Sequence, residues 1–217
     1  MRFPSARKGV RTIFVGVLIE LIVAISSIVV SVLVTFPETN TYGTTLYFVN
    51  STIAALAAIS AIAAFILEIV GLFQAKADDK SFAYALWVIL ISVIATIVSF
   101  SLSFINQPWS KDAIVIIDTV SGVAGLIVVM YILTGISNLT EKLNENSFAK
   151  SGRILRVIIG ILFLIALALN LIANFIRVSP EGIKIMGYVA IGAGGVQLVA
   201  YIWYFIYLAR APKKLGK

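Results

Sequence analysis

Hydrophobic residues fall into six long and nearly continuous runs, and short polar stretches separate them. The runs cover residues 12–36, 46–73, 82–105, 113–136, 154–176 and 185–208. A helix of about 20 apolar residues crosses the roughly 30 Å hydrocarbon core of a bilayer. The strands of a membrane barrel would instead alternate polar and apolar residues over short segments. The pattern therefore predicts six transmembrane helices.

The polar connections between the runs are short. The longest covers 137–152, and turn-forming residues such as Pro37, Pro108 and Pro180 mark three of the others. None of these connections is long enough to hold a separate folded domain. We expect an all-α, polytopic membrane protein in which residues 1–217 form a single membrane domain.

Basic residues are concentrated on one side of this predicted bundle. The chain has 17 Lys and Arg against 10 Asp and Glu. Only Lys111, Arg177 and Lys184 fall on one side, and the other 14 basic residues flank the opposite side. By the positive-inside rule the 14 lie in the cytoplasm, so both termini are predicted there, in a plasma-membrane protein. These charges lie in short segments that flank the predicted spans, and no folded domain presents them as a groove. Binding of nucleic acid is therefore excluded.

Composition removes several classes of function. Of the residues, 60% are hydrophobic and 12% charged, and the chain has no Cys and no His. This excludes a disulfide scaffold, metal or haem sites built on Cys or His, and nucleophiles activated by His. An intramembrane aspartyl protease needs two Asp in its spans, and only Asp118 lies in one. We therefore expect no enzyme, no cofactor and no metal, with lipid chemistry at Asp118 as the one enzymatic alternative.

Two carboxylates lie at similar depth on the inner side of the first two runs. Glu20 is eight residues into the first run, and Glu68 is five residues before the end of the second. An acid at the centre of a membrane helix costs about 2.5–3.5 kcal/mol, so its presence points to a function. The two could share a proton or bind a cation. Alternatively, Glu68 pairs with Lys76 or Lys80, and Glu20 forms one hydrogen bond between helices.

Further polar residues lie in the outer half of the runs, and we take them as candidates for solute binding. They are Asp118, Asn50, Asn170, Asn174, Arg177 and Gln197. If they converge, Arg177 would meet a carboxylate and Asp118 an amine of a small polar or zwitterionic solute. The alternative is that they only form hydrogen bonds between helices.

Short matches between hairpins suggest an internal repeat. Gly71-Leu72 followed by Ser81-Phe82-Ala83 resembles Gly135-Ile136 followed by Ser147-Phe148-Ala149. These matches predict three parallel two-helix hairpins, each entering from the cytoplasm.

Two further patterns concern packing. Small residues of the second run would allow close helix contacts, inside the chain or between copies of it. They are Ala54, Ala58 and Ala61 together with Ala57, Ser60 and Ala64. Trp203, Tyr204 and Tyr207 near the inner end of the last run are typical of interfacial aromatics.

Residues 71–83, Gly-Leu-Phe-Gln-Ala-Lys-Ala-Asp-Asp-Lys-Ser-Phe-Ala, resemble a loop of small six-span membrane proteins of Gram-positive bacteria that have no assigned function. That resemblance implies the layout and no activity. The span number and length are also similar to those of the substrate-capturing subunits of energy-coupling-factor vitamin transporters, an analogy of architecture.

Two functions follow from these features. The first is a transport component that binds a small polar solute or ion in the outer half of the bundle. The second is a membrane scaffold or partner subunit of a larger complex. Its partners would be the lipid bilayer and either further copies of the chain or other membrane subunits.

The cysteine-free sequence makes the orientation testable. In intact cells, Glu38→Cys and Lys111→Cys should react with a membrane-impermeant maleimide, because both positions are predicted outside the cell. Glu145→Cys should react only after the cells are lysed. Labelling with the opposite pattern would reverse the predicted orientation.

Overall fold

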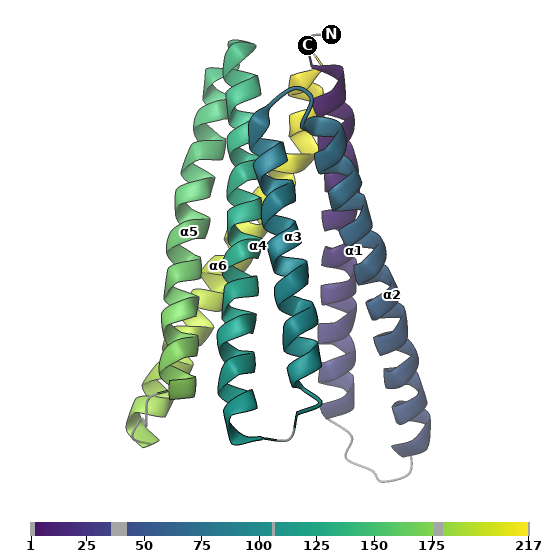
Figure 1. Cartoon of the computed structure of the whole chain (residues 1–217), viewed down its shortest axis with the longest axis vertical. Coiled ribbons are helices and arrows are strands. Elements are labelled where there is room, and N and C mark those ends of the chain that lie inside the picture. Colours follow the sequence, from purple (N-terminus) through teal and green to yellow (C-terminus); the bar gives the residue numbers. More distant parts are fainter. Residues whose placement is uncertain (1–2, 36–42, 106, 176–179, 217) are drawn as a thin grey trace.

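The computed structural model describes residues 3–35, 43–105, 107–175 and 180–216, and over these residues the chain forms six helices (Figure 1). They are α1 (Pro4–Thr35), α2 (Gly43–Ala75), α3 (Lys80–Leu102), α4 (Pro108–Lys142), α5 (Asn146–Phe175) and α6 (Pro180–Leu215). Within the described residues each predicted hydrophobic run lies on one of these helices, except that residues 103–105 follow the end of α3, and no strand occurs there. The all-α prediction is confirmed.

Four helical stretches within the described residues are long and apolar enough to cross a membrane. They are Leu56–Ala75, Lys80–Leu102, Trp109–Lys142 and Asn146–Leu169. Only 11–22% of their most apolar windows is buried inside the protein. Large apolar side chains such as Trp87 and Phe100 instead point outward, with 68% and 66% of their surface exposed. An apolar surface of this extent suits contact with lipid.

The helices pack as neighbouring hairpins arranged in a ring. The most extensive contacts join α1 to α2 and α3 to α4, and smaller ones join α4 to α5, α5 to α6 and α6 back to α1. α2 touches α3 least among sequence neighbours. In Figure 1, α1 begins and α6 ends at the same end of the bundle, which we call the terminal end.

Among the described side chains, the buried core lies mainly at this terminal end. Val10, Leu72, Phe82, Ile136 and Leu208, from five helices, are all fully buried there. Among the described residues, every buried side-chain nitrogen and oxygen has a hydrogen-bond partner.

The loop between α2 and α3 is tied down by two adjacent aspartates. Asp79 caps α3 by accepting a hydrogen bond from the Ser81 amide at 2.8 Å. Asp78 accepts one from the Ala6 amide at 2.5 Å, in the first turn of α1. Carboxylates at helix N-termini satisfy free amides and complement the helix dipole. The loop thereby holds the starts of α1 and α3 together.

α1 and α2 approach closely because glycines face each other across the contact. A Cβ on Gly71 would lie 2.6 Å from the Gly9 carbonyl oxygen, and a Cβ on Gly9 would collide with the Gly71 carbonyl oxygen. Two turns further along α1, a Cβ on Gly16 would lie 2.9 Å from the carbonyl oxygen of Ala64. Small residues allow this approach where lipid provides no hydrophobic force between helices.

The small residues of α2 differ in what they face. Ala64 is fully buried against α1, whereas Ala58 and Ala61 are exposed on the outside of the bundle. The position of Ala54 lies outside the described side chains. The face with Ala64 therefore provides the contact within the chain.

Gly71→Ala should destabilise the protein by about 1–3 kcal/mol, because the added methyl meets backbone atoms that cannot move independently. Gly125→Ala is the matched control, since a Cβ there meets no other atom within 4 Å. It should be neutral or up to about 1 kcal/mol stabilising. Unfolding in mixed micelles, followed by circular dichroism, measures both. Equal stability of the two variants would contradict the close α1–α2 contact.

Candidate functional site

Glu20 of α1 and Glu68 of α2 form a carboxylate pair inside the bundle. Glu68 lies against α1 at Gly16, where a Cβ would be only 3.2 Å from its Cγ. Glu20 is one helical turn beyond Gly16 on the same face of α1. The two acids are close enough to interact electrostatically, and both side chains are partly buried. The missing side chain at Gly16 thus makes room for Glu68 beside Glu20.

Two tyrosines of α6 approach this pair from a third helix. Tyr201 and Tyr204 both interact electrostatically with Glu20 and with Glu68. Their rings are 6.4 Å apart between centroids, and Tyr204 is only 4% exposed. Beside them, the rings of Phe14 and Phe205 pack at 5.0 Å and hold α6 against α1. We refer to Glu20, Glu68, Tyr201 and Tyr204 as the carboxylate–tyrosine cluster.

The described residues provide no positive charge for this cluster. Within the described residues, neither Glu20 nor Glu68 has an ion pair or a hydrogen bond. Lys76, one of the two lysines considered as a partner of Glu68, instead lies over the Phe73 ring with its Nζ 3.5 Å from the ring centroid. Two like charges without a counter-ion are unfavourable in an apolar bundle.

The tyrosines also line a cavity of about 110 Å³ between α4, α5 and α6. Its walls are otherwise apolar: Val129, Ile159, Leu162, Phe163 and Ala200. Because Tyr201 and Tyr204 are the only lining residues with polar side chains among those described, the cavity suits water or a small apolar group better than a charged solute. The cluster therefore lies between an apolar cavity and the α1–α2 contact.

Asp118 lies on α4, away from this cluster. Its Oδ1 accepts a hydrogen bond from Ser99 of α3 at 2.6 Å, and its side chain is exposed. It borders an open groove of about 310 Å³ between α4 and α5, in which Thr119 is the other polar lining residue. The remaining predicted solute ligands fall outside the side chains that the structure describes: Asn50, Asn170, Asn174, Arg177 and Gln197.

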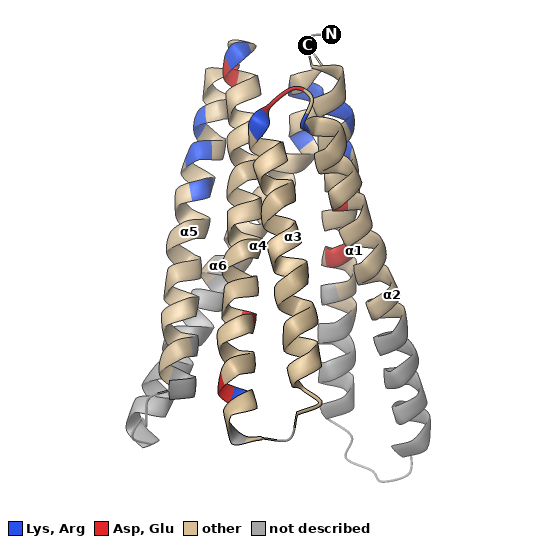
Figure 2. Ribbon diagram, in the orientation of Figure 1, with Lys and Arg blue, Asp and Glu red and all other residues tan. Residues whose placement is uncertain are grey.

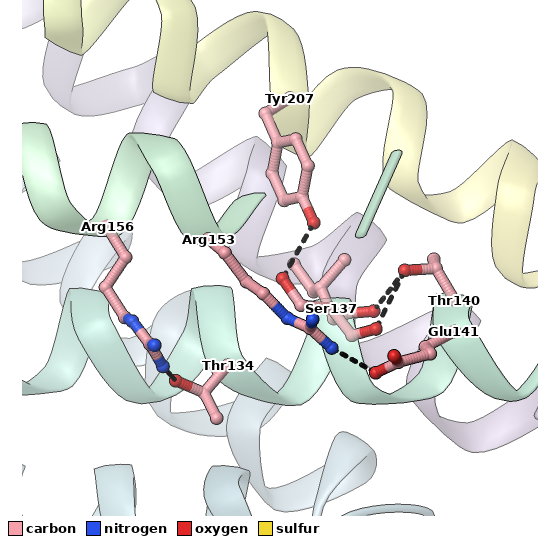
Figure 3. A network of polar contacts seen from close by, with 8 residues as sticks. Thr134, Ser137, Thr140, Glu141, Arg153, Arg156 and Tyr207 are labelled. Carbon is pink, nitrogen blue, oxygen red and sulfur yellow. Dashed lines mark hydrogen bonds and ion pairs between the residues drawn. The ribbon is translucent and has the colours of Figure 1, made fainter. Parts of the chain in front are cut away.

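A network of polar contacts joins α4, α5 and α6 near the terminal end (Figure 3). Arg153 pairs with Glu141, and the Arg156 guanidinium donates to the Thr134 hydroxyl at 2.7 Å. Nearby, the Tyr207 and Ser137 hydroxyls are 3.4 Å apart. These contacts fix the faces that α4 and α5 turn toward each other.

Gly152 of α5 leaves the space in which Tyr207 and Ser137 meet. A Cβ at this glycine would collide with both hydroxyl oxygens. Phe148, one turn earlier on α5, stacks on the Tyr207 ring at 4.3 Å between centroids. α6 is thereby packed against the first turns of α5.

The expectation that Tyr204 and Tyr207 are interfacial is wrong. They are 4% and 2% exposed and face the interior, whereas Trp203 is 37% exposed. Aromatic residues with a polar end suit both an interface and a buried contact, so residue type alone could not separate the two. Their spacing with the buried Leu208 and Ala211 marks one face of α6 and was the available clue.

No family model, curated protein or solved structure matches this chain.

In a buffer without alkali or alkaline-earth cations, Glu68→Gln should stabilise the protein by about 1 kcal/mol or more at pH 8, because it removes a partly buried charge for which no described side chain supplies a counter-ion. The gain should shrink at pH 5, where a carboxylate more readily takes up a proton. Unfolding in mixed micelles at the two pH values measures it. The control Glu141→Gln loses an exposed ion pair and should change stability by less than about 1 kcal/mol.

The double variant Glu20→Gln with Glu68→Gln should gain less than the sum of the single gains, because each substitution already relieves the repulsion between the acids. Fully additive gains would mean that the acids do not interact. Destabilisation by Glu68→Gln would mean that the carboxylate has a favourable partner.

Proposed function

We propose that this chain is a six-span protein of the plasma membrane that acts as a transport component, with Glu20 and Glu68 binding a proton or a small cation. The observation that carries the proposal is the carboxylate pair without a basic partner in the described residues. Such a pair is stable only when a positive charge accompanies it. Because no side chain there supplies that charge, a mobile species does.

The composition of the cluster suits this ligand. Carboxylate and phenol oxygens are hard donors, which favour protons and alkali or alkaline-earth cations over soft metals. The cluster also brings together three helices, α1, α2 and α6, so that occupancy changes the forces between them. Binding at the cluster can therefore bias how α6 packs against the α1–α2 hairpin.

The distribution of charge supports the proposed orientation. Figure 2 shows Lys and Arg gathered at the terminal end of the described helices. The positive-inside rule places this end in the cytoplasm. Six spans return the chain to the side on which it starts, in agreement with the placement of α1 and α6 in Figure 1.

The proposal includes three repeated hairpins. Ser81-Phe82-Ala83 and Ser147-Phe148-Ala149 occupy the first turns of α3 and α5. The buried Ala6 and Gly9 of α1 likewise correspond to the buried Ala149 and Gly152 of α5. Ala6 with Ala149, and Gly9 with Gly152, thus take matching buried positions at one end of the bundle, as parallel repeats require. The Ser-Phe-Ala segments match in their place along the helix only, because Ser81 is buried whereas Ser147 is exposed.

Asp118 remains our candidate for recognition of a solute, with its carboxylate binding an amine. The Ser99 hydrogen bond orients one oxygen, and the groove beside it leaves the side chain accessible. The chain has no phosphate-binding loop of an ATPase, so transport would draw on an ion gradient or on a separate energising subunit.

Proteoliposomes test the role of the carboxylates. Purified protein is reconstituted with a pH-sensitive dye or, in parallel vesicles, a sodium-sensitive dye inside, and flux is driven by a potassium diffusion potential or by a sodium gradient. The native protein should move protons or sodium ions, and Glu20→Gln and Glu68→Gln should each lower that flux about tenfold or more. Glu141→Gln, at an exposed ion pair, should keep it.

Two outcomes would contradict the proposal. Flux that is unchanged in both carboxylate variants would remove these residues from the pathway. A native protein that moves neither ion would instead favour the scaffold function, in which polar residues only hold the bundle together.

A further inference from the structure

Arg156 of α5 uses few of its hydrogen-bond donors. A guanidinium carries five N–H groups. In the described residues one of its nitrogens donates to the Thr134 hydroxyl, and no carboxylate lies in contact with Arg156 (Figure 3). The Thr134 hydroxyl is itself fixed, because it donates to the Met130 carbonyl oxygen at 2.7 Å. Arg156 is therefore held in one direction while most of its donors stay available.

The nearby acids are already engaged. Glu141 pairs with Arg153, which lies one turn before Arg156 on the same helix. Glu145 pairs with Lys214 of α6 at 2.8 Å. Arg156 thus carries a positive charge that the acids of this part of the bundle do not balance.

Arg156 also lies at the border between basic and apolar surface. Toward the start of α5, Lys150 and Arg153 are exposed. Next to Arg156, Ile154 and Val157 are exposed apolar side chains, with 43% and 56% of their surface accessible. In Figure 2 the basic positions of α5 are confined to the part of the helix near the terminal end.

At such a border the anion present in a membrane is the phosphate of a lipid headgroup. Arg binds phosphate through two parallel hydrogen bonds, and anionic lipids are attracted to clustered basic residues. Exposed Ile154 and Val157 would contact the acyl chains of the same lipid. We propose that Arg156, assisted by Lys150, binds the headgroup phosphate of an anionic lipid between α4 and α5. This site rests on the membrane placement above and is independent of the carboxylate–tyrosine cluster.

Lipid binding in detergent tests the site. The full-length protein is titrated with short-chain phosphatidylglycerol, and binding is followed by the shift in melting temperature and by native mass spectrometry. Phosphatidylglycerol should raise the melting temperature, whereas phosphatidylcholine and inorganic phosphate should have little effect. Arg156→Gln should weaken phosphatidylglycerol binding about tenfold, as expected for lost charged hydrogen bonds.

The control Arg11→Gln removes the same charge from an exposed position on α1 and should leave the affinity unchanged. Arg156→Lys keeps the charge but loses the planar donors, and Thr134→Val removes the hydroxyl that orients Arg156. Both should weaken binding less than Arg156→Gln, and both keep the test informative if that variant does not fold.

Three results would overturn the site. Equal weakening by Arg11→Gln would mean that attraction to the basic end is diffuse. Equal stabilisation by the two lipids would mean that headgroup charge is not recognised. Stabilisation by inorganic phosphate to the same extent would assign the site to a free anion in place of a lipid.

Discussion

The close contact between α1 and α2 determines where the chemically important residues lie. Glycines and alanine in this contact let the two backbones touch, and this fixes both the separation and the register of the helices. Gly16 faces Ala64 and leaves space for Glu68, which brings Glu68 beside Glu20 one turn away. A shift of one residue in this register would rotate Glu68 by about 100° away from α1. The acid pair is thus a direct consequence of how the hairpin packs.

α6 uses a different kind of packing to close the ring. Its inward face carries Tyr204, Tyr207 and Leu208, and these large side chains fill the space between α1 and the α4–α5 pair. Each tyrosine then places a polar group in the interior. Tyr207 meets a hydroxyl on α4, so its polar group is satisfied within the protein. Tyr201 and Tyr204 face acids instead, which makes α6 sensitive to whether those acids are charged.

The sequence predicted the positions of the helices well, because long apolar runs have few alternatives to a helix. The sequence also indicated that Glu20 and Glu68 lie at similar depth and could approach each other, because acids are rare in such runs. The structure brings the two acids together. The Gly9–Gly71 contact could not be predicted, because these helices are apolar on nearly all sides and hydropathy does not show which side faces a neighbour. For the same reason the sequence wrongly predicts an interfacial position for Tyr204 and Tyr207, which are buried. Only the packed structure shows which side of each helix faces a neighbour.

The charged residues of the described helices fall into two groups. Some have an oppositely charged side chain or a backbone amide as a partner within the protein, and others have neither. At the terminal end, Glu141 and Glu145 each meet a basic side chain, and Asp78 and Asp79 each meet a backbone amide. These acids therefore have structural roles, because each has a partner within the protein. Among the described residues, Glu20 and Glu68 have no such partner, and Arg156 has no acidic one.

These opposite charges could in principle neutralise each other, but the bundle keeps them on separate helices. Arg156 lies on α5 and is turned toward α4, whereas the two acids lie on the α1–α2 contact with α6 beside them. A chain that needed only stability would gain by pairing them or by replacing them with apolar residues. Keeping an anionic pair and an arginine without an acidic partner at separate sites fits a protein in which a small cation binds the acids and a lipid phosphate binds the arginine.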